Sequence, residues 1–201
     1  MKKFDTPTAS KCTRLSTPPG QHGLKRKKVG DYLLQLRAKQ SIKYTYNILD
    51  RQFKNYFKKA LRKKGNTGFL LLLLLETRLD NIVYRMGFAT TRAEARQMVS
   101  HNHVLVSDKN TDAYDSFSQL NWKPVNIPSF QVKIGCFVGI KRSKIHLKRI
   151  QNSLAERKNE KIPYWITLNS KEFFGKLDTV PKRCDLPSQY NEQLVVELYS
   201  K

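Results

Sequence analysis

The chain has 201 residues, of which 38 are Lys or Arg and 16 are Asp or Glu, so its formal net charge is +22. Hydrophobic residues make up 39% of the chain, and we therefore expect one or two modest domains with a thin core. A protein this basic repels itself unless an anion neutralises it. Nucleic acid is the favoured partner, and an acidic membrane surface is the rival.

Cysteine usage and hydropathy argue against several classes of protein. Cys12, Cys136 and Cys184 are far apart and odd in number, so no disulfide framework is expected and a reducing compartment is favoured. No CxxC pair is present, and Cys12 with His22 is too small a set for a zinc site, so we expect no metal or other cofactor. The longest apolar run, residues 69–75, is much shorter than the roughly 20 residues that span a bilayer. No secretory signal follows the first lysines, and the sequence predicts a soluble intracellular protein.

Positive charge is concentrated near the N-terminus, where residues 1–65 hold 18 Lys and Arg against 3 acidic residues. Residues 1–30 mix prolines and glycines with these cations, which predicts a basic extended arm. The run Lys25, Arg26, Lys27 and Lys28 favours an arm that follows RNA phosphates over a merely solvated tail.

The segment after this arm is predicted to be helical. Asp31 can cap a first helix, and a second helix follows Asp50 with apolar residues at i, i+3, i+4, i+7 and i+8 from Phe53. Cations crowd its other side without interleaved acids and repel each other at i, i+4. This pattern favours phosphate contact over a solvated face for Lys58, Lys59, Arg62, Lys63 and Lys64. A third helix, capped by Asn66 or Thr67, carries six leucines at 70–75.

Residues 76–107 read as two helices followed by a strand. Leu75, Leu79, Ile82, Val83 and Met86 recur at helical spacing, so one face of the first helix is expected to be buried, and Gly87 ends it. Three polar residues share another face, at i, i+3 and i+7, which we expect to be free to meet a partner: Arg78, Asn81 and Arg85.

The second helix of this stretch opens with a capping box from Thr91 to Glu94. Arg92 and Arg96 lie one turn apart on it, and residues 104–106 form a β-branched and apolar run typical of a strand. His101 and His103 would point to opposite sides of that strand. Contact with phosphate or base, or a simple surface role, is favoured over metal binding for these two residues.

The stretch RLDNIVYRMGFATTRAEARQMVSHNHVLV resembles the RNA-binding domain of the small-subunit ribosomal protein S-four family, in its bacterial and plastid form. PPGQHG, RQFKNYFKKALRKKGNTG, VNIPS and NEQLVVELYS extend the resemblance over most of the chain. It implies an α+β protein: a helical N-terminal domain with a basic extended arm, plus a small α/β RNA-binding domain of two helices followed by a curved β-sheet. We place the arm at 1–30, the helical domain at 31–75, joined by 141–201, and the RNA-binding domain at 76–140.

The same resemblance implies a structural constituent of the small ribosomal subunit, without enzymatic activity. Such a protein is a primary binder of the 5′ domain of small-subunit rRNA, nucleates assembly of the subunit body, touches neighbouring ribosomal proteins, and lies near the mRNA entry path, where it affects translational accuracy. We expect a central RNA face made of Arg78, Asn81, Arg85, Arg92, Arg96, Gln97, Ser100 and His103. Residues 25–28 and the cations of 58–64 would form a flanking phosphate clamp.

The remainder of the chain departs from the family pattern in places. Residues 108–123 are an acidic insertion that we expect to project as a loop toward solvent or a protein neighbour, since phosphates would repel it. Residues 130–140 predict strands, with Cys136 as a structural turn residue. Within the basic segment 141–161, Leu147, Ile150 and Leu154 predict a helix. Residues 194–199 predict a final strand.

Two other functions remain open at this point. The same RNA-binding domain is appended to RNA-modifying enzymes, although the chain has no Gly-rich loop or paired carboxylates. A DNA-binding helix-turn-helix repressor matches the helix spacing superficially, but not the basic arm or the sheet. The Lys-, Asn- and Ile-rich composition suggests an organelle, with the chloroplast stroma ahead of a mitochondrion or a bacterial cytoplasm.

Overall fold

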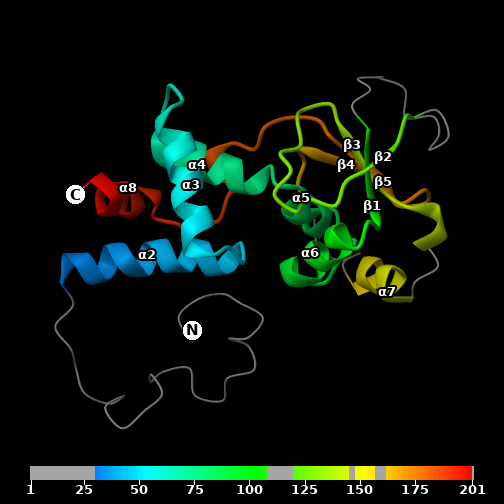
Figure 1. Cartoon of the computed structure of the whole chain (residues 1–201), viewed down its shortest axis with the longest axis horizontal. Helices are drawn as coiled ribbons and strands as arrows, with labels where there is room; N and C mark the ends of the chain where they lie inside the picture. The colour runs from blue at the N-terminus through cyan, green and yellow to red at the C-terminus, as the bar shows by residue number, and fades with distance from the viewer. Residues whose placement is uncertain (1–29, 108–119, 145–147, 157–161, 201) are drawn as a thin grey trace, which may run out of the picture. The chain divides into compact units, whose positions relative to one another are not determined.

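A computed structural model describes residues 30–107, 120–144, 148–156 and 162–200 (Figure 1). Contacts divide the described chain into two compact units. The helical unit comprises the described residues up to Leu72 together with those from Leu186 onward, and the sheet unit comprises Leu73–Asp185. Across these described ranges, no helix is both long enough and apolar enough to cross a membrane.

The helical unit contains α2 (Asp31–Thr45), α3 (Asp50–Leu61), the first part of α4 (Thr67–Glu76) and α8 (Glu192–Ser200). The predicted stripe of α3 is buried, since Phe53, Tyr56, Phe57 and Ala60 are at most 5% exposed. Residue Asn66 caps α4 as expected, because its side-chain oxygen accepts hydrogen bonds from the two backbone N–H groups at positions 68 and 69.

The C-terminal segment is a helix, so the predicted strand at 194–199 is wrong. The Asn191 side chain accepts a hydrogen bond from the N–H of Leu194 at the start of α8. Val195 is fully buried, and Tyr199, one turn later, stacks on Phe57 of α3 with ring centroids 4.6 Å apart. Capping and burial of one helical face therefore override the strand preference of a β-branched pair.

The sheet unit is built on five antiparallel strands in the order β2-β1-β3-β5-β4. The strands are β1 (Val104–Ser107), β2 (Lys123–Pro124), β3 (Phe137–Ile140), β4 (Ile166–Asn169) and β5 (Phe174–Leu177). The helices are α5 (Leu79–Arg85), α6 (Arg92–Ser100) and α7 (Lys148–Glu156), with short 3-10 turns at Arg142–Lys144 and Arg183–Asp185.

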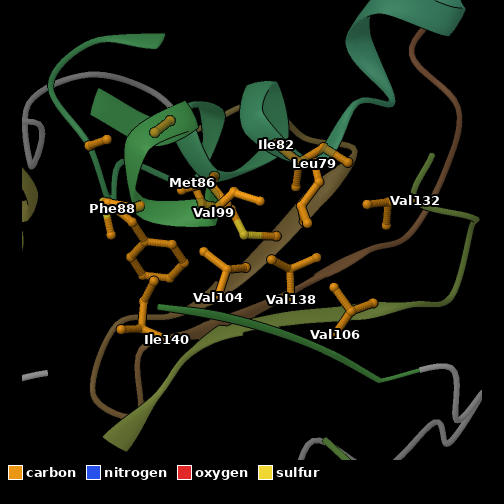
Figure 2. Packing of buried hydrophobic residues seen from close by; sticks show 14 of the residues in the cluster. Leu79, Ile82, Met86, Phe88, Val99, Val104, Val106, Val132, Val138 and Ile140 are labelled. Carbon is orange, nitrogen blue, oxygen red and sulfur yellow. The ribbon is translucent and has the colours of Figure 1, made fainter. Parts of the chain in front are cut away.

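One face of this sheet carries the main core. Figure 2 shows Leu79, Ile82 and Met86 from the helical side pointing toward Val104 and Val138 of β1 and β3. All five are at most 1% exposed. Burial of this apolar layer holds α5 and α6 on the sheet and so sets which faces of the two helices point away from it.

Two sequence predictions for the sheet unit need correction. Only 137–140 of the predicted 130–140 run is a strand, because Gly135 (φ 83°) and Cys136 form a turn, closed by the N–H of Cys136 donating to the carbonyl oxygen of Lys133 at 3.2 Å. The described residues between 141 and 185 belong to the sheet unit, where β4 and β5 extend the sheet and Ile150 enters its core. The segment that joins the helical unit therefore begins at Leu186, well after residue 141.

Most of the predicted insertion, residues 108–119, lies outside the described residues.

Candidate nucleic-acid interface

Two buried carboxylates organise the start of α5. Asp80 is 3% exposed and accepts two hydrogen bonds from Arg78, from Nε at 3.0 Å and from Nη2 at 2.7 Å. Its Oδ2 also accepts from Nη2 of Arg96 on α6 at 3.0 Å. A buried carboxylate is tolerated only when it is paired, and Asp80 meets this requirement by holding two guanidinium groups.

Glu76, at the end of α4, holds the second half of the cluster. It is 3% exposed and accepts hydrogen bonds from Nδ2 of Asn81 and from Nη2 of Arg85, both at 2.6 Å. The Asn81 Oδ1 in turn accepts from Nε of Arg92 at 2.9 Å, and the Arg92 guanidinium lies 4.4 Å from the centroid of the Tyr84 ring. We call these residues the arginine network: Glu76, Arg78, Asp80, Asn81, Arg85, Arg92 and Arg96.

The expectation that Arg78, Asn81 and Arg85 lie on a free helix face is wrong. Arg78 is 4% exposed and Asn81 is 2% exposed, and the Arg85 side chain retains 20% exposure. The reason is an interruption of the helix, since α4 ends at Glu76 and α5 begins only at Leu79. Arg78 therefore precedes the helix in an extended conformation, and the side chains that reach toward solvent are those of the partly exposed arginines of α5 and α6.

The ends of the helices follow the sequence predictions. The Thr91 Oγ1 accepts a hydrogen bond from the N–H of Glu94, and Glu94 Oε2 accepts from the N–H and hydroxyl of Thr90. The predicted capping box is thus confirmed, with its reciprocal bond displaced by one residue. Gly87 has φ 82°, as a helix C′ glycine requires. These caps set where α6 begins, and hence which of its side chains face outward: Gln97 and Ser100 are exposed.

His101 and His103 lie together, which corrects the expectation that they point to opposite sides of a strand. Their ring centroids are 5.9 Å apart at an interplanar angle of 82°. Asn102 between them has φ 57° and β1 begins only at Val104, so both histidines belong to the turn after α6. Within the described ranges, no group of three or more His, Cys, Asp or Glu residues could hold a metal ion.

A second cationic surface lies on α3 in the helical unit. The α3 cation face consists of exposed side chains that form no ion pair with any described residue: Lys54, Lys58, Lys59, Arg62, Lys63 and Lys64. Lys39 and Lys43 of α2 differ, because both pair with Asp50, at 2.9 and 3.7 Å. The predicted arm residues Lys25, Arg26, Lys27 and Lys28 lie outside the described residues.

Sequence reasoning missed the acidic half of the interface. Glu76 and Asp80 flank Arg78 within five residues of a strongly basic chain. That local alternation of charge is the signal that could have revealed the arginine network. The cavity between α6 and α7 could not be predicted from the sequence, because Arg149 and Ile150 of α7 meet the residues of α6 only in the folded chain.

Comparison with known proteins covers both units. A family model for the ribosomal protein S4/S9 N-terminal domain matches residues 1–76, and the S4 domain model matches residues 77–109. The small ribosomal subunit protein uS4 of Chromobacterium violaceum is 48% identical over 192 residues, which are 96% of this chain and 86% of the relative. The uS4 proteins of Xanthomonas campestris and Xanthomonas oryzae are 50% identical over 194 residues, with the same coverage. The chain belongs to the uS4 family. The match to the S4 domain spans α5, α6 and β1, so it includes every member of the arginine network except Glu76.

Proposed function

We propose that the chain is a structural constituent of the small ribosomal subunit and binds small-subunit rRNA directly. Membership of the uS4 family carries this proposal. The S4 domain match falls on the two helices that present the fixed arginines, and the charge of +22 supplies the electrostatic attraction that binding to a polyanion requires.

The two cationic surfaces have different tasks in this proposal. The α3 cation face meets phosphates, which relieves the repulsion among its side chains and releases condensed counterions. The arginine network presents Arg85, Arg92 and Arg96 in fixed orientations, and a guanidinium held in place matches phosphate oxygens in a bidentate geometry. Exposed polar residues of α6, Gln97 and Ser100, with His103 beside them, contact bases or riboses. Lys25 to Lys28 would extend the clamp.

The finer role follows from the family resemblance. The chain is proposed to bind the 5′ domain of the rRNA as a primary binder, to nucleate assembly of the subunit body, and to lie near the mRNA entry path, where it influences accuracy. Neighbouring small-subunit proteins are its other partners, and its contribution is structural rather than catalytic. The named relatives are bacterial, which gives a bacterial cytoplasm more support than composition alone gave it. The chloroplast stroma stays a prediction.

The test is a binding titration of the full chain against the transcribed 5′ domain of small-subunit rRNA, with unrelated structured RNA and duplex DNA as competitors, each over a salt series. We expect the cognate domain to bind about a thousandfold more tightly than the competitors. The double substitution Lys58→Gln/Arg62→Gln, in the α3 cation face, should weaken the binding of all RNAs and reduce the salt slope by about one for each phosphate that is no longer neutralised. Lys171→Gln, an exposed cation in the β4–β5 turn, is the matched control and should change neither quantity.

Equal affinity for all three nucleic acids with a common salt slope would show that charge alone drives binding, and would reject a specific rRNA role. A preference for the duplex DNA at matched salt would instead revive a DNA-binding repressor. Pseudouridine formation in the transcribed RNA on incubation with the pure chain would contradict the non-enzymatic assignment.

A further inference from the structure

A cavity of about 210 Å³ opens between α6 and α7 of the sheet unit, on the far side of α6 from the arginine network. We propose that this cavity receives a single unstacked nucleobase of the rRNA. The proposal rests on the proposed function and deepens it, because it names the chemical group that the protein would recognise in addition to phosphate. The cavity is lined by Glu94, Gln97, Met98, His101, His103, Arg149 and Ile150.

One wall of the cavity is a single face of α6. Glu94, Gln97, Met98 and His101 stand at i, i+3, i+4 and i+7 on α6 and therefore share one face. The left-handed turn at Asn102 brings the His103 ring back beside that face. Arg149 and Ile150 of α7 line the opposite side. Elsewhere on α7, the Ser153 hydroxyl donates to the carbonyl oxygen of Gly87 at 2.8 Å and anchors the helix to the chain before α6. The site is thus fixed by two helices and a turn.

The size of the cavity selects a small, flat ligand. Pockets that enclose drug-sized molecules measure about 300–1,000 Å³, so a cavity of about 210 Å³ admits one ring system and leaves the sugar and phosphate outside. Met98 and Ile150 are 8% and 2% exposed and form the apolar floor of the cavity. The two imidazole rings stand nearly perpendicular, so one can present a face and the other an edge to a planar ring.

The polar groups match the edge of a base rather than a phosphate. Gln97 carries both a donor and an acceptor, and base edges display both in alternation. The carboxylate of Glu94 lines the cavity and already bonds Thr90 and pairs with Arg149 at 3.4 Å. Because Glu94 and Arg149 offset each other's charge, the wall gives a phosphate no net attraction, whereas an uncharged base needs none. Unstacked bases in RNA complexes are held in this way, by aromatic or guanidinium planes together with edge hydrogen bonds.

The experiment combines protein variants with single abasic positions in the 5′ domain RNA. Bases that become protected from chemical modification on binding the full-length chain identify the candidate nucleotides, and each is replaced in turn by an abasic residue. Gln97→Ala/His101→Ala should weaken binding about tenfold without changing the salt slope. One abasic RNA should weaken wild-type binding by a similar factor, and combining that RNA with the variant should weaken it no further. Gln151→Ala, exposed on α7 and absent from the cavity wall, is the control and should bind as wild type.

Two results would overturn the inference while leaving the proposed function intact. In the first, wild type still prefers the 5′ domain, but each abasic position lowers the affinity of the variant by the same factor as it lowers that of wild type. No nucleotide would then be coupled to the cavity. In the second, a photoreactive amino acid at position 101 crosslinks to a protein rather than to RNA in reconstituted subunits, which would assign the cavity to a protein neighbour. Loss of 5′ domain preference by wild type itself would instead reject the proposed function.

Discussion

Asp80→Asn tests whether the arginine network is held by its buried carboxylate. The substitution keeps the shape of the side chain but removes the charge that faces Arg78 and Arg96. The Arg78 and Asp80 side chains are only 5% and 4% exposed, so water cannot replace the missing partner, whereas Arg96 at 30% remains partly hydrated. Breaking a buried ion pair by removing one partner costs about 3–5 kcal/mol. The Asn oxygen can still accept one hydrogen bond, and we therefore expect a loss near the lower end, about 3 kcal/mol.

Asp50→Asn is the matched control. Asp50 also faces two cations, Lys39 and Lys43, but its side chain is 56% exposed. Exposed pairs contribute at most about 1 kcal/mol because solvent screens them. The hydrogen bond from Lys39 lowers the pKa of Asp50. A carboxyl with a lowered folded-state pKa adds stability above its unfolded value of about 3.9, and this contribution is lost as the pH falls through the folded value. The difference between wild type and Asp50→Asn should accordingly disappear in strong acid.

Urea unfolding gives the total effect of each substitution, and native-state hydrogen exchange assigns it to a unit. The helical and sheet units need not unfold together, so amides of α5 and α6 are compared with amides of α2 and α3. Asp80→Asn should lower protection in α5 and α6, and Asp50→Asn should lower it slightly in α2 and α3. If Asp80→Asn costs no more than Asp50→Asn, the buried carboxylate does not hold the guanidinium groups and the reasoning fails.

Three further substitutions address other parts of the fold. Thr91→Ala removes the N-cap acceptor of α6 and should cost about 1 kcal/mol in urea unfolding, while Thr91→Ser should restore stability. Burial raises the pKa of Tyr199 to about 12. Because the unfolded chain ionises this phenol at about pH 10, the stability that Tyr199 contributes should be lost as the pH rises from about 10 to about 12, and a pH series on Tyr199→Phe should lack that part of the fall. A Cβ on Gly175 would lie 2.8 Å from the Thr167 carbonyl oxygen, so Gly175→Ala should lower the unfolding free energy by about 1–3 kcal/mol, whereas Gly30→Ala, in open space, should not.

Local patterns predicted the helices well because their causes are local. The apolar stripe of α3, the cap at Thr91 and the glycine end at Gly87 each depend on residues within a turn or two of one another. The C-terminal strand failed because its β-branched residues, read alone, favour extended backbone. Val195 and Tyr199 become helical through packing against α2 and α3, more than a hundred residues earlier.

The candidate site was predicted only in part for a related reason. Helical spacing placed Arg92 and Arg96 on one side of α6, as the structure has them, but it treated residues 76–86 as an uninterrupted helix. The break before Leu79 turns Arg78 inward onto Asp80. Pairs such as Glu76 with Arg85 join different helices, and no periodicity within a single helix predicts them. The burial of Glu76 and Asp80 could not be predicted from the sequence and is seen only in the structure.

The placement of two acids inside a cationic surface leads to a prediction whose sign separates two mechanisms. Asp80→Asn adds one positive unit to the surface, so a binding mode set by net charge would strengthen all RNA complexes. In the arginine network the carboxylate instead holds Arg78 and Arg96 in place. A released arginine must be ordered again on binding, at about 0.5–1.5 kcal/mol for each immobilised side chain. We therefore expect folded Asp80→Asn to bind the 5′ domain about fivefold more weakly and unrelated RNA equally or slightly more tightly. Parallel strengthening of both complexes, in titrations at one salt concentration, would show that the orientation of these guanidinium groups contributes nothing to recognition.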